Sequence, residues 1–216
     1  MNPAPPPSSS SSSVLDLAPV IPVVVLEDAA DAVPLARALV AGGLPAIEVT
    51  LRTEAAPEAI RAIAQAVPEA VVGAGTVLGP QDVQTAVAAG ARFLVSPGWT
   101  DTLLEAMRAS GLPFLPGVST VSEVVALLER GVTELKFFPA EAAGGTGYLK
   151  SLASPLPRAR FCPTGGVTAA NAPGYLALPN VACVGGTWML PADALAAKDW
   201  ERVRALAAEA AATGGR

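Results

Sequence analysis

The chain has 216 residues, of which 51% are hydrophobic and 15% are charged, with a formal net charge of −5 and a pI near 4.8. This length and composition support one folded domain near the compact end of (β/α)8 barrel sizes. The acidic balance argues against nucleic acid or an anionic membrane surface as a partner, and no apolar run is long enough to span a membrane. Histidine is absent, which excludes Ser-His and Cys-His nucleophile pairs and the usual zinc sites.

The start of the chain differs in composition from the rest. A serine run at 8–13 follows several prolines, and no basic segment precedes an apolar one. We therefore expect a disordered lead-in over residues 1–15, no secretory signal, a cytoplasmic location and a single domain over residues 16–216. Cys162 and Cys183 lie in short apolar stretches, and without an export signal we predict small core residues rather than a disulfide.

From there on, short apolar runs alternate with Ala- and Leu-rich stretches of helical period. We predict strands at residues 20–26, 46–51, 71–75, 93–96, 114–118, 134–138, 160–163 and 181–185. We predict helices at residues 29–41, 53–66, 80–89, 100–109, 120–130, 145–152, 168–176 and 193–206, the last in one or two pieces. Eight such alternations, with strands apolar enough to be covered on both faces, predict an α/β fold closed into a (β/α)8 TIM barrel. A doubly wound open sheet is the alternative, although no GxGxxG follows the first strand.

Lys136 is one of three lysines, and it alone lies inside an apolar run, LKFFP. An ammonium in apolar surroundings loses solvation, which favours the neutral amine that attacks ketones to form a Schiff base. A lysine whose stem packs on the core while its head reaches solvent is the alternative, and for an isolated case the more common one.

A carboxylate and a guanidinium share the second predicted strand. Period-2 alternation puts Glu48, Thr50 and Arg52 on one face, and in a barrel the active site lies where strands end. If this face points inward, Glu48 and Arg52 enter the mouth together with Lys136; a structural Glu-Arg pair is the alternative.

Paired glycine turns follow the last two predicted strands. Gly165 and Gly166 end the seventh strand, and Gly185 and Gly186 end the eighth. Barrels often bind phosphate at these two turns, through bare N–H groups and a helix N-terminus. We therefore predict a phosphate site made of backbone amides and hydroxyls, with simple turn chemistry as the alternative.

Five motifs in this order resemble the class I KDPG aldolases, the 2-dehydro-3-deoxy-6-phosphogluconate aldolases also described as 4-hydroxy-2-oxoglutarate aldolases. They are EVTLRT at 48–53, GAGTV at 73–77, SPG at 96–98, KFFPAE at 136–141 and FCPTGG at 161–166. The resemblance extends from about residue 20 to about residue 207. It implies cleavage of KDPG to pyruvate and glyceraldehyde 3-phosphate, with no cofactor and no metal, in a homotrimer.

The resemblance also implies roles for single residues. Lys136 would be the Schiff-base lysine, Glu48 the general base, and Arg52 the ligand of the pyruvyl carboxylate. Thr76 would donate a hydroxyl to that carboxylate, and Pro97 and Phe138 would form apolar walls. Thr164 would contact the aldehyde-derived hydroxyls. The phosphate would be held by Gly165, Gly166, Gly186 and Thr187.

Two departures from the family pattern concern the phosphate end. Thr187 replaces a serine of some members, and Pro19 and Val20 stand where relatives can carry a phosphate-binding arginine. A preference for 4-hydroxy-2-oxoglutarate or for the galactonate-derived C4 epimer is therefore an open alternative. A catalytically silent barrel serving as an assembly scaffold is another, opposed by the joint presence of Glu48, Arg52, Thr76 and Lys136.

Overall fold

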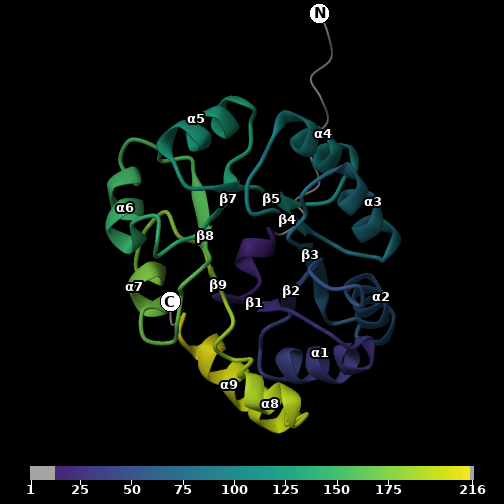
Figure 1. Cartoon of the computed structure of the whole chain (residues 1–216). Helices are drawn as coiled ribbons and strands as arrows, with labels where there is room; N and C mark the ends of the chain where they lie inside the picture. Colours follow the sequence, from purple (N-terminus) through teal and green to yellow (C-terminus); the bar gives the residue numbers. More distant parts are fainter. Residues whose placement is uncertain (1–12, 215–216) are drawn as a thin grey trace, which may run out of the picture.

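The computed structural model describes residues 13–214 as an α/β fold in which all paired strands run parallel (Figure 1). The strands are β1 (Val20–Val24), β2 (Ala46–Thr50), β3 (Val71–Gly75), β4 (Leu94–Val95), β5 (Phe114–Leu115), β6 (Gly117–Val118), β7 (Glu134–Phe137), β8 (Arg160–Pro163) and β9 (Val184–Gly186). Each predicted strand segment overlaps at least one of them, so the predicted α/β class and parallel pairing are confirmed.

The strands form two curled sheets within the described residues. Six strands pair in the order β5-β4-β3-β2-β1-β9, and three pair in the order β6-β7-β8. Single parallel bridges, Phe161 to Val181 and Thr164 to Gly185, connect the β8 segment to the chain around β9. The predicted single ring of eight strands is therefore seen as a six-stranded and a three-stranded sheet.

The division falls inside the predicted fifth strand, at Pro116. Proline has no N–H to donate to a neighbouring strand, so ladder pairing is interrupted on that side. The carbonyl of Pro116 still accepts a hydrogen bond from the Lys136 N–H at 3.0 Å. The predicted strand 114–118 consequently becomes β5, which pairs with β4, and β6, which pairs with β7.

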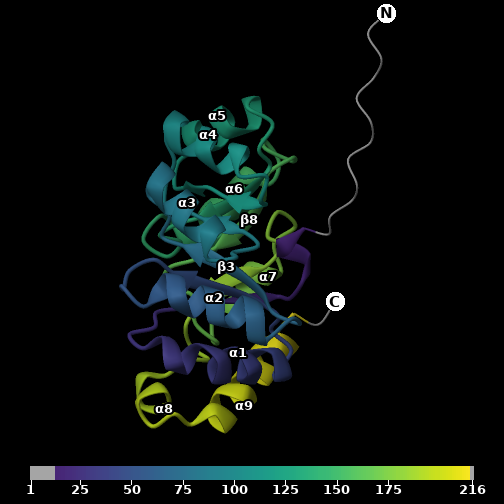
Figure 2. The same ribbon diagram turned by 90° about the vertical axis from the view of Figure 1, so that its right-hand side faces the viewer.

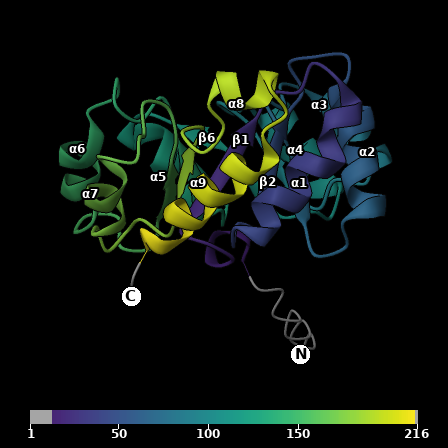
Figure 3. The same cartoon turned by 90° about the horizontal axis from the view of Figure 1, so that it is seen from below.

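Helices surround the strands (Figures 1 and 2). The α-helices are α1 (Ala32–Ala41), α2 (Ala56–Ala66), α3 (Pro80–Ala88), α4 (Asp101–Ala109), α5 (Val121–Glu129), α6 (Gly145–Leu152), α7 (Ala172–Leu176), α8 (Ala192–Ala196) and α9 (Trp200–Ala212). Two short 3-10 helices, η1 (Val14–Asp16) and η2 (Ala29–Asp31), precede β1 and α1. The first and last α-helices, α1 and α9, lie side by side (Figures 1 and 3). None of the helices described is long and apolar enough to cross a membrane.

Two apolar layers result from strand alternation. One lies between strands and helices and includes Ile47, Leu94 and Phe161. The other lines the concave side of the strands and contains side chains from β1, β2, β4, β5 and β8 and from residues next to β4 and β9. Its members on the strands and their flanking residues are Ile21, Ala46, Phe93, Val95, Leu115, Cys162 and Cys183.

Val14 and Leu15 of η1 belong to this concave layer and are 5% and 1% exposed. Arg160 fixes η1 in place, because it forms ion pairs with Asp16 and, at 2.7 Å, with Glu134 at the start of β7. Residues 1–12 of the expected disordered lead-in lie outside the described residues, but the boundary at residue 15 needs correction. Two apolar side chains that close the amino-terminal end of the strands make residues 13–15 part of the folded domain.

Both cysteines are buried and carry no disulfide, as predicted. They lie on the concave side, where interaction with Cys162, followed by burial, raises the pKa of the Cys183 thiol. A buried thiol of raised pKa is poorly reactive, which agrees with a packing role.

Candidate active site

A buried ion pair lies on the concave side of the strands. Lys136 on β7 and Glu48 on β2 face one another, with Nζ and Oε1 3.2 Å apart. Their side chains are only 5% and 4% exposed. Removing both charges from water is costly, and each partner compensates the other, so loss of one would leave an uncompensated charge.

Alternation along each strand explains why these two side chains meet. Leu135 and Phe137 point to the helix layer, so Lys136 between them points to the concave side. The same reasoning applies to Glu48, whose neighbours Ile47 and Val49 pack against helices. The prediction that both side chains share the inner face is confirmed.

A glycine on the neighbouring strand makes room for the carboxylate. Gly75 ends β3, and a Cβ built on it would overlap the Glu48 side chain, from Cγ to Oε1. The space at Gly75 thus holds the Glu48 side chain, and the space at Gly73 on the same strand holds the Phe93 ring.

Arg52 lies just after β2, close to the end of β3. Its Nε donates a hydrogen bond to Thr76 Oγ1 at 3.1 Å, and the Arg52 side chain is exposed. Thr76 has a φ of +58°, in the left-handed region that non-glycine residues rarely adopt. Such a backbone costs about 1–2 kcal/mol and is typical of functional positions. The predicted carboxylate ligands are therefore brought together.

Two half-buried apolar residues border the site. The Phe138 ring centroid lies 5.3 Å from Lys136 Nζ, close enough for a cation–π contact. Pro97 follows β4, and its backbone occupies the space where Gly117 of β6 lacks a side chain. Their role as walls around the substrate stays a prediction.

The predicted phosphate residues come from two adjacent segments. Thr164 bridges Gly185, and its hydroxyl fills the space left by that glycine. Gly165 and Gly166 follow with φ values of +99° and +80°, which glycine adopts without strain. Thr187 comes directly after β9 and is exposed. These residues lie at or directly after the carboxyl ends of β8 and β9.

Two details of this phosphate prediction are corrected by the structure. The helix expected from residue 168 begins at Ala172 and has five residues, so it supplies no helix N-terminus directly behind Gly166. The side of Gly186 where a Cβ would project is occupied by the Trp188 ring. Any anion held there would contact the backbone of Gly186 rather than a space beside its Cα.

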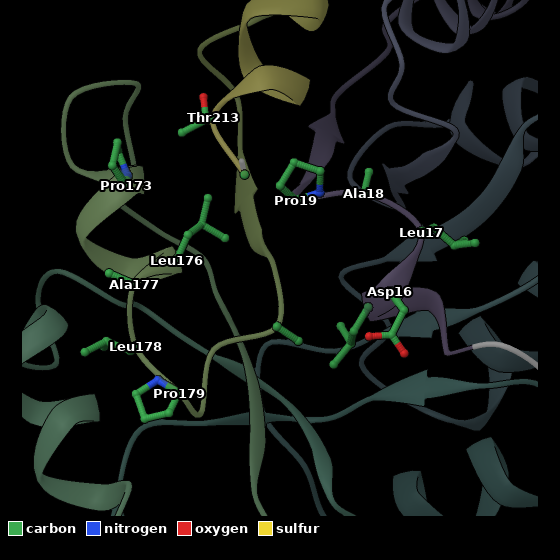
Figure 4. A pocket seen from close by; sticks show the side chains of 13 residues that line it. Asp16, Leu17, Ala18, Pro19, Pro173, Leu176, Ala177, Leu178, Pro179 and Thr213 are labelled. Atoms are coloured by element: carbon green, nitrogen blue, oxygen red, sulfur yellow. The ribbon is translucent and has the colours of Figure 1, made fainter. Parts of the chain in front are cut away.

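A cavity of about 730 Å³ lies at the opposite end of the strands (Figure 4). It is lined by residues that precede β1 and β9 and by the end of α9, including Asp16, Pro19 and Thr213. Figure 4 shows mainly apolar side chains around it. The buried lysine, its carboxylate partner and the glycine turns lie at the carboxyl ends, so the candidate active site is there.

The chain is similar to known proteins of one family. Residues 12–206 match the family model of the KDPG and KHG aldolases. The chain is 54% identical to the KHG/KDPG aldolase of Escherichia coli K12 over 202 residues, which cover 94% of this chain and 95% of that protein.

Two solved structures resemble the fold over nearly the whole chain. The KDPG aldolase of Legionella pneumophila, with pyruvate captured as a covalent carbinolamine, is 46% identical with a TM-score of 0.89, covering 92% of this chain and 96% of that one. The KDPG aldolase of Zymomonas mobilis ZM4 with 3-phosphoglycerate is 50% identical with a TM-score of 0.87, covering 93% and 94%. On this evidence the chain belongs to the KDPG and KHG aldolase family.

Proposed function

We propose that this protein is a class I aldolase that cleaves 2-dehydro-3-deoxy-6-phosphogluconate to pyruvate and glyceraldehyde 3-phosphate. The observation that carries the proposal is the buried pair of Lys136 and Glu48, 3.2 Å apart on the concave side of the strands. An amine nucleophile within hydrogen-bond distance of a carboxylate base is the arrangement that Schiff-base catalysis needs.

In the proposed reaction, Glu48 takes a proton from the Lys136 ammonium, and the neutral Nζ then attacks the C2 ketone to form a carbinolamine. Glu48 transfers protons as water leaves, and a protonated imine results. Glu48 then removes the C4 hydroxyl proton, the C3–C4 bond breaks, and its electron pair moves through C2 to the imine nitrogen as an enamine. Glyceraldehyde 3-phosphate leaves with its new aldehyde, C3 is protonated, and water hydrolyses the imine to release pyruvate.

The other residues would hold the substrate. Arg52 would bind the pyruvyl carboxylate, because a guanidinium matches two carboxylate oxygens, and Thr76 would add a hydroxyl. Phe138 and Pro97 would shield the imine from water. Thr164 would contact the hydroxyls of the aldehyde product.

The phosphate would bind to Gly165, Gly166, Gly186 and Thr187. Gly165 and Gly166 make no N–H hydrogen bond to protein among the described residues, so their donors are available to an anion. The covalent pyruvate in the Legionella relative and the 3-phosphoglycerate in the Zymomonas relative support the two ends of this binding mode. Preference for 4-hydroxy-2-oxoglutarate is the second candidate, since the E. coli relative is named for both substrates.

We also propose that the two sheets form one closed (β/α)8 barrel in a single domain. The bridges between β8 and the chain around β9 link the sheets on one side, and β5 contacts β7 on the other. A homotrimer and a cytoplasmic location complete the proposal. Exposed apolar side chains offer contact surface between subunits. They are Leu78, which follows β3, and Val121 and Val125, which lie one helical turn apart on α5.

A direct assay tests the function. The purified protein should release pyruvate from 2-dehydro-3-deoxy-6-phosphogluconate, measured by coupling to lactate dehydrogenase, with a higher kcat/KM than on 4-hydroxy-2-oxoglutarate. The expected difference arises because only the first substrate carries a phosphate for the glycine turns. The reverse order of kcat/KM would favour the second candidate, and release of pyruvate from neither would reject both.

Gly75→Ala is expected to lower aldolase turnover by about 10²-fold, comparable to loss of a general base. The added methyl group would occupy the space of the Glu48 side chain and displace its carboxylate from Lys136. Circular dichroism and thermal unfolding would monitor folding, and kcat would be measured on 2-dehydro-3-deoxy-6-phosphogluconate. Gly98→Ala is the matched control, since a Cβ there meets no atom within 4 Å. Equal kcat in both variants would contradict the proposed dependence on Glu48 position.

A further inference from the structure

The carbonyl groups of the glycine turn after β8 are tied back into the protein. The Glu141 N–H donates to the Gly165 carbonyl at 3.0 Å. The side-chain amide of Asn171 donates from Nδ2 to the Gly166 carbonyl at 3.1 Å. In a planar trans peptide, the carbonyl and the following N–H point in opposite directions. Fixing these two carbonyls therefore also fixes the N–H groups of Gly166 and Val167.

Those N–H groups have no acceptor in the part of the chain that the structure describes. Neither Gly166 nor Val167 donates a backbone hydrogen bond to protein there. Each therefore lies opposite an anchored carbonyl and is free to donate to an anion. The anchors decide whether the anion meets N–H groups or carbonyl oxygens, which would repel it.

Asn171 is held so that its amide can make this contact. Its Oδ1 accepts from the Thr168 N–H at 2.7 Å, and its own N–H donates to Thr168 Oγ1 at 3.4 Å. Because Oδ1 accepts from the Thr168 N–H, Nδ2 is left facing the Gly166 carbonyl. The reversed amide would place a donor against the Thr168 N–H and an acceptor against the Gly166 carbonyl.

Asn171 also borders a cavity. The cavity has a volume of about 480 Å³ and is lined in part by Glu141, Thr146 and Asn171. Glu141 is itself fixed by Tyr175, whose hydroxyl donates to Glu141 Oε1, and burial followed by this hydrogen bond raises the Tyr175 pKa. Asn171 is thus the one side chain among the described residues that donates to the Gly166 carbonyl.

We propose that Asn171 is a positioning residue that determines selectivity for phosphorylated over unphosphorylated substrates, by holding the peptide between Gly166 and Val167 so that the Val167 N–H faces the phosphate as a further donor beside the glycine amides. The inference rests on the proposed aldolase function and extends it to a residue that touches neither substrate nor Lys136. Without the anchor, Gly166 can change its backbone angles at little cost, because glycine has no Cβ to restrict them.

Asn171→Ala tests the proposal on two substrates that differ in one group. These are 2-dehydro-3-deoxy-6-phosphogluconate and 2-dehydro-3-deoxygluconate, the same sugar acid without its phosphate. We expect KM for the phosphorylated substrate to rise about tenfold, the scale of one charge-assisted hydrogen bond. KM for the unphosphorylated substrate and kcat for both should stay within about twofold, because the imine chemistry is untouched. Inorganic phosphate should inhibit cleavage of the unphosphorylated substrate about tenfold less strongly in the variant.

Two further variants separate the possible causes. Asn180→Ala removes another amide that donates to a carbonyl, that of Leu149 at 2.8 Å, and neither residue belongs to the glycine turn. It should lower stability without changing the ratio of the two KM values. Asn171→Asp removes the donor and adds a charge, so it should impair phosphate binding at least as much as Asn171→Ala.

The outcomes distinguish the inference from the function on which it rests. A wild-type protein that cleaves neither substrate would reject the aldolase proposal itself. An active wild type with equal KM increases on both substrates in Asn171→Ala would reject the positioning role. The same holds if Asn171→Ala leaves both KM values unchanged and only Asn171→Asp weakens phosphate binding, since charge alone would then explain the effect.

Discussion

Replacement of Lys136 by alanine is expected to abolish pyruvate trapping and to lower aldolase turnover by on the order of 10⁴-fold or more, the scale seen when a covalent nucleophile is removed. Wild-type protein incubated with pyruvate and reduced with borohydride should carry a single adduct, located at Lys136 by peptide mass. The physical reason is that Lys136 is the buried amine paired with a carboxylate. Lys150 is exposed, and Lys198 is paired with Asp31 on the surface.

The control for this experiment must separate chemistry from folding. Removing Lys136 leaves Glu48 buried without its cation, which can cost several kcal/mol of stability. Lys136→Met keeps the apolar stem and should be measured beside the alanine variant, with unfolding followed by circular dichroism. Lys150→Ala should retain both trapping and turnover. An adduct on Lys150 or Lys198 alone in the wild type, or none at all, would contradict the mechanism.

Glu48→Gln is expected to slow retro-aldol turnover by about 10²-fold or more while pyruvate can still be trapped on Lys136. The amide oxygen of glutamine can keep the hydrogen bond to Lys136 Nζ, but it cannot take the C4 hydroxyl proton. Turnover and the rate of borohydride-trapped adduct formation, measured separately, should therefore diverge.

Glu134→Gln is the matched control for the base. Glu134 lies on the same strand as Lys136, but its carboxylate is paired with Arg160 near the amino-terminal end. Its replacement should leave kcat unchanged and affect stability only slightly, as expected for a partly exposed ion pair. If Glu48→Gln and Glu134→Gln had the same kcat as wild type, Glu48 would not be the base.

The inner faces of the strands could be predicted because alternation is a local property. Lys136 is charged and its neighbours Leu135 and Phe137 are apolar, so the pattern assigns Lys136 to one face of the strand and its neighbours to the other. Proximity of Lys136 to Glu48 follows from the parallel arrangement, although 88 residues separate them. The family resemblance added the expected roles, which no periodicity could supply.

Other features depended on contacts that a sequence does not display. Pro116 could have suggested the break between β5 and β6, since proline interrupts ladders. The function of Gly75 could not be foreseen, because its missing Cβ matters only once Glu48 projects across from the neighbouring strand. Asn171 lies inside the predicted helix 168–176, and only its three-dimensional position relative to Gly166 revealed it as an anchor.

The buried η1 segment has a consequence for how the protein can be joined to other molecules. Ser13 precedes η1, and Gly214 lies against Pro19 just before β1, so both ends of the described chain emerge on the face opposite Lys136. In Figure 2, η1 and the end of α9 lie on the same side of the molecule. A fusion partner or surface tether attached there would leave the substrate entrance unobstructed. A linker that replaces the chain up to Leu15 would instead remove the side chains of Val14 and Leu15, which close the amino-terminal end of the strands.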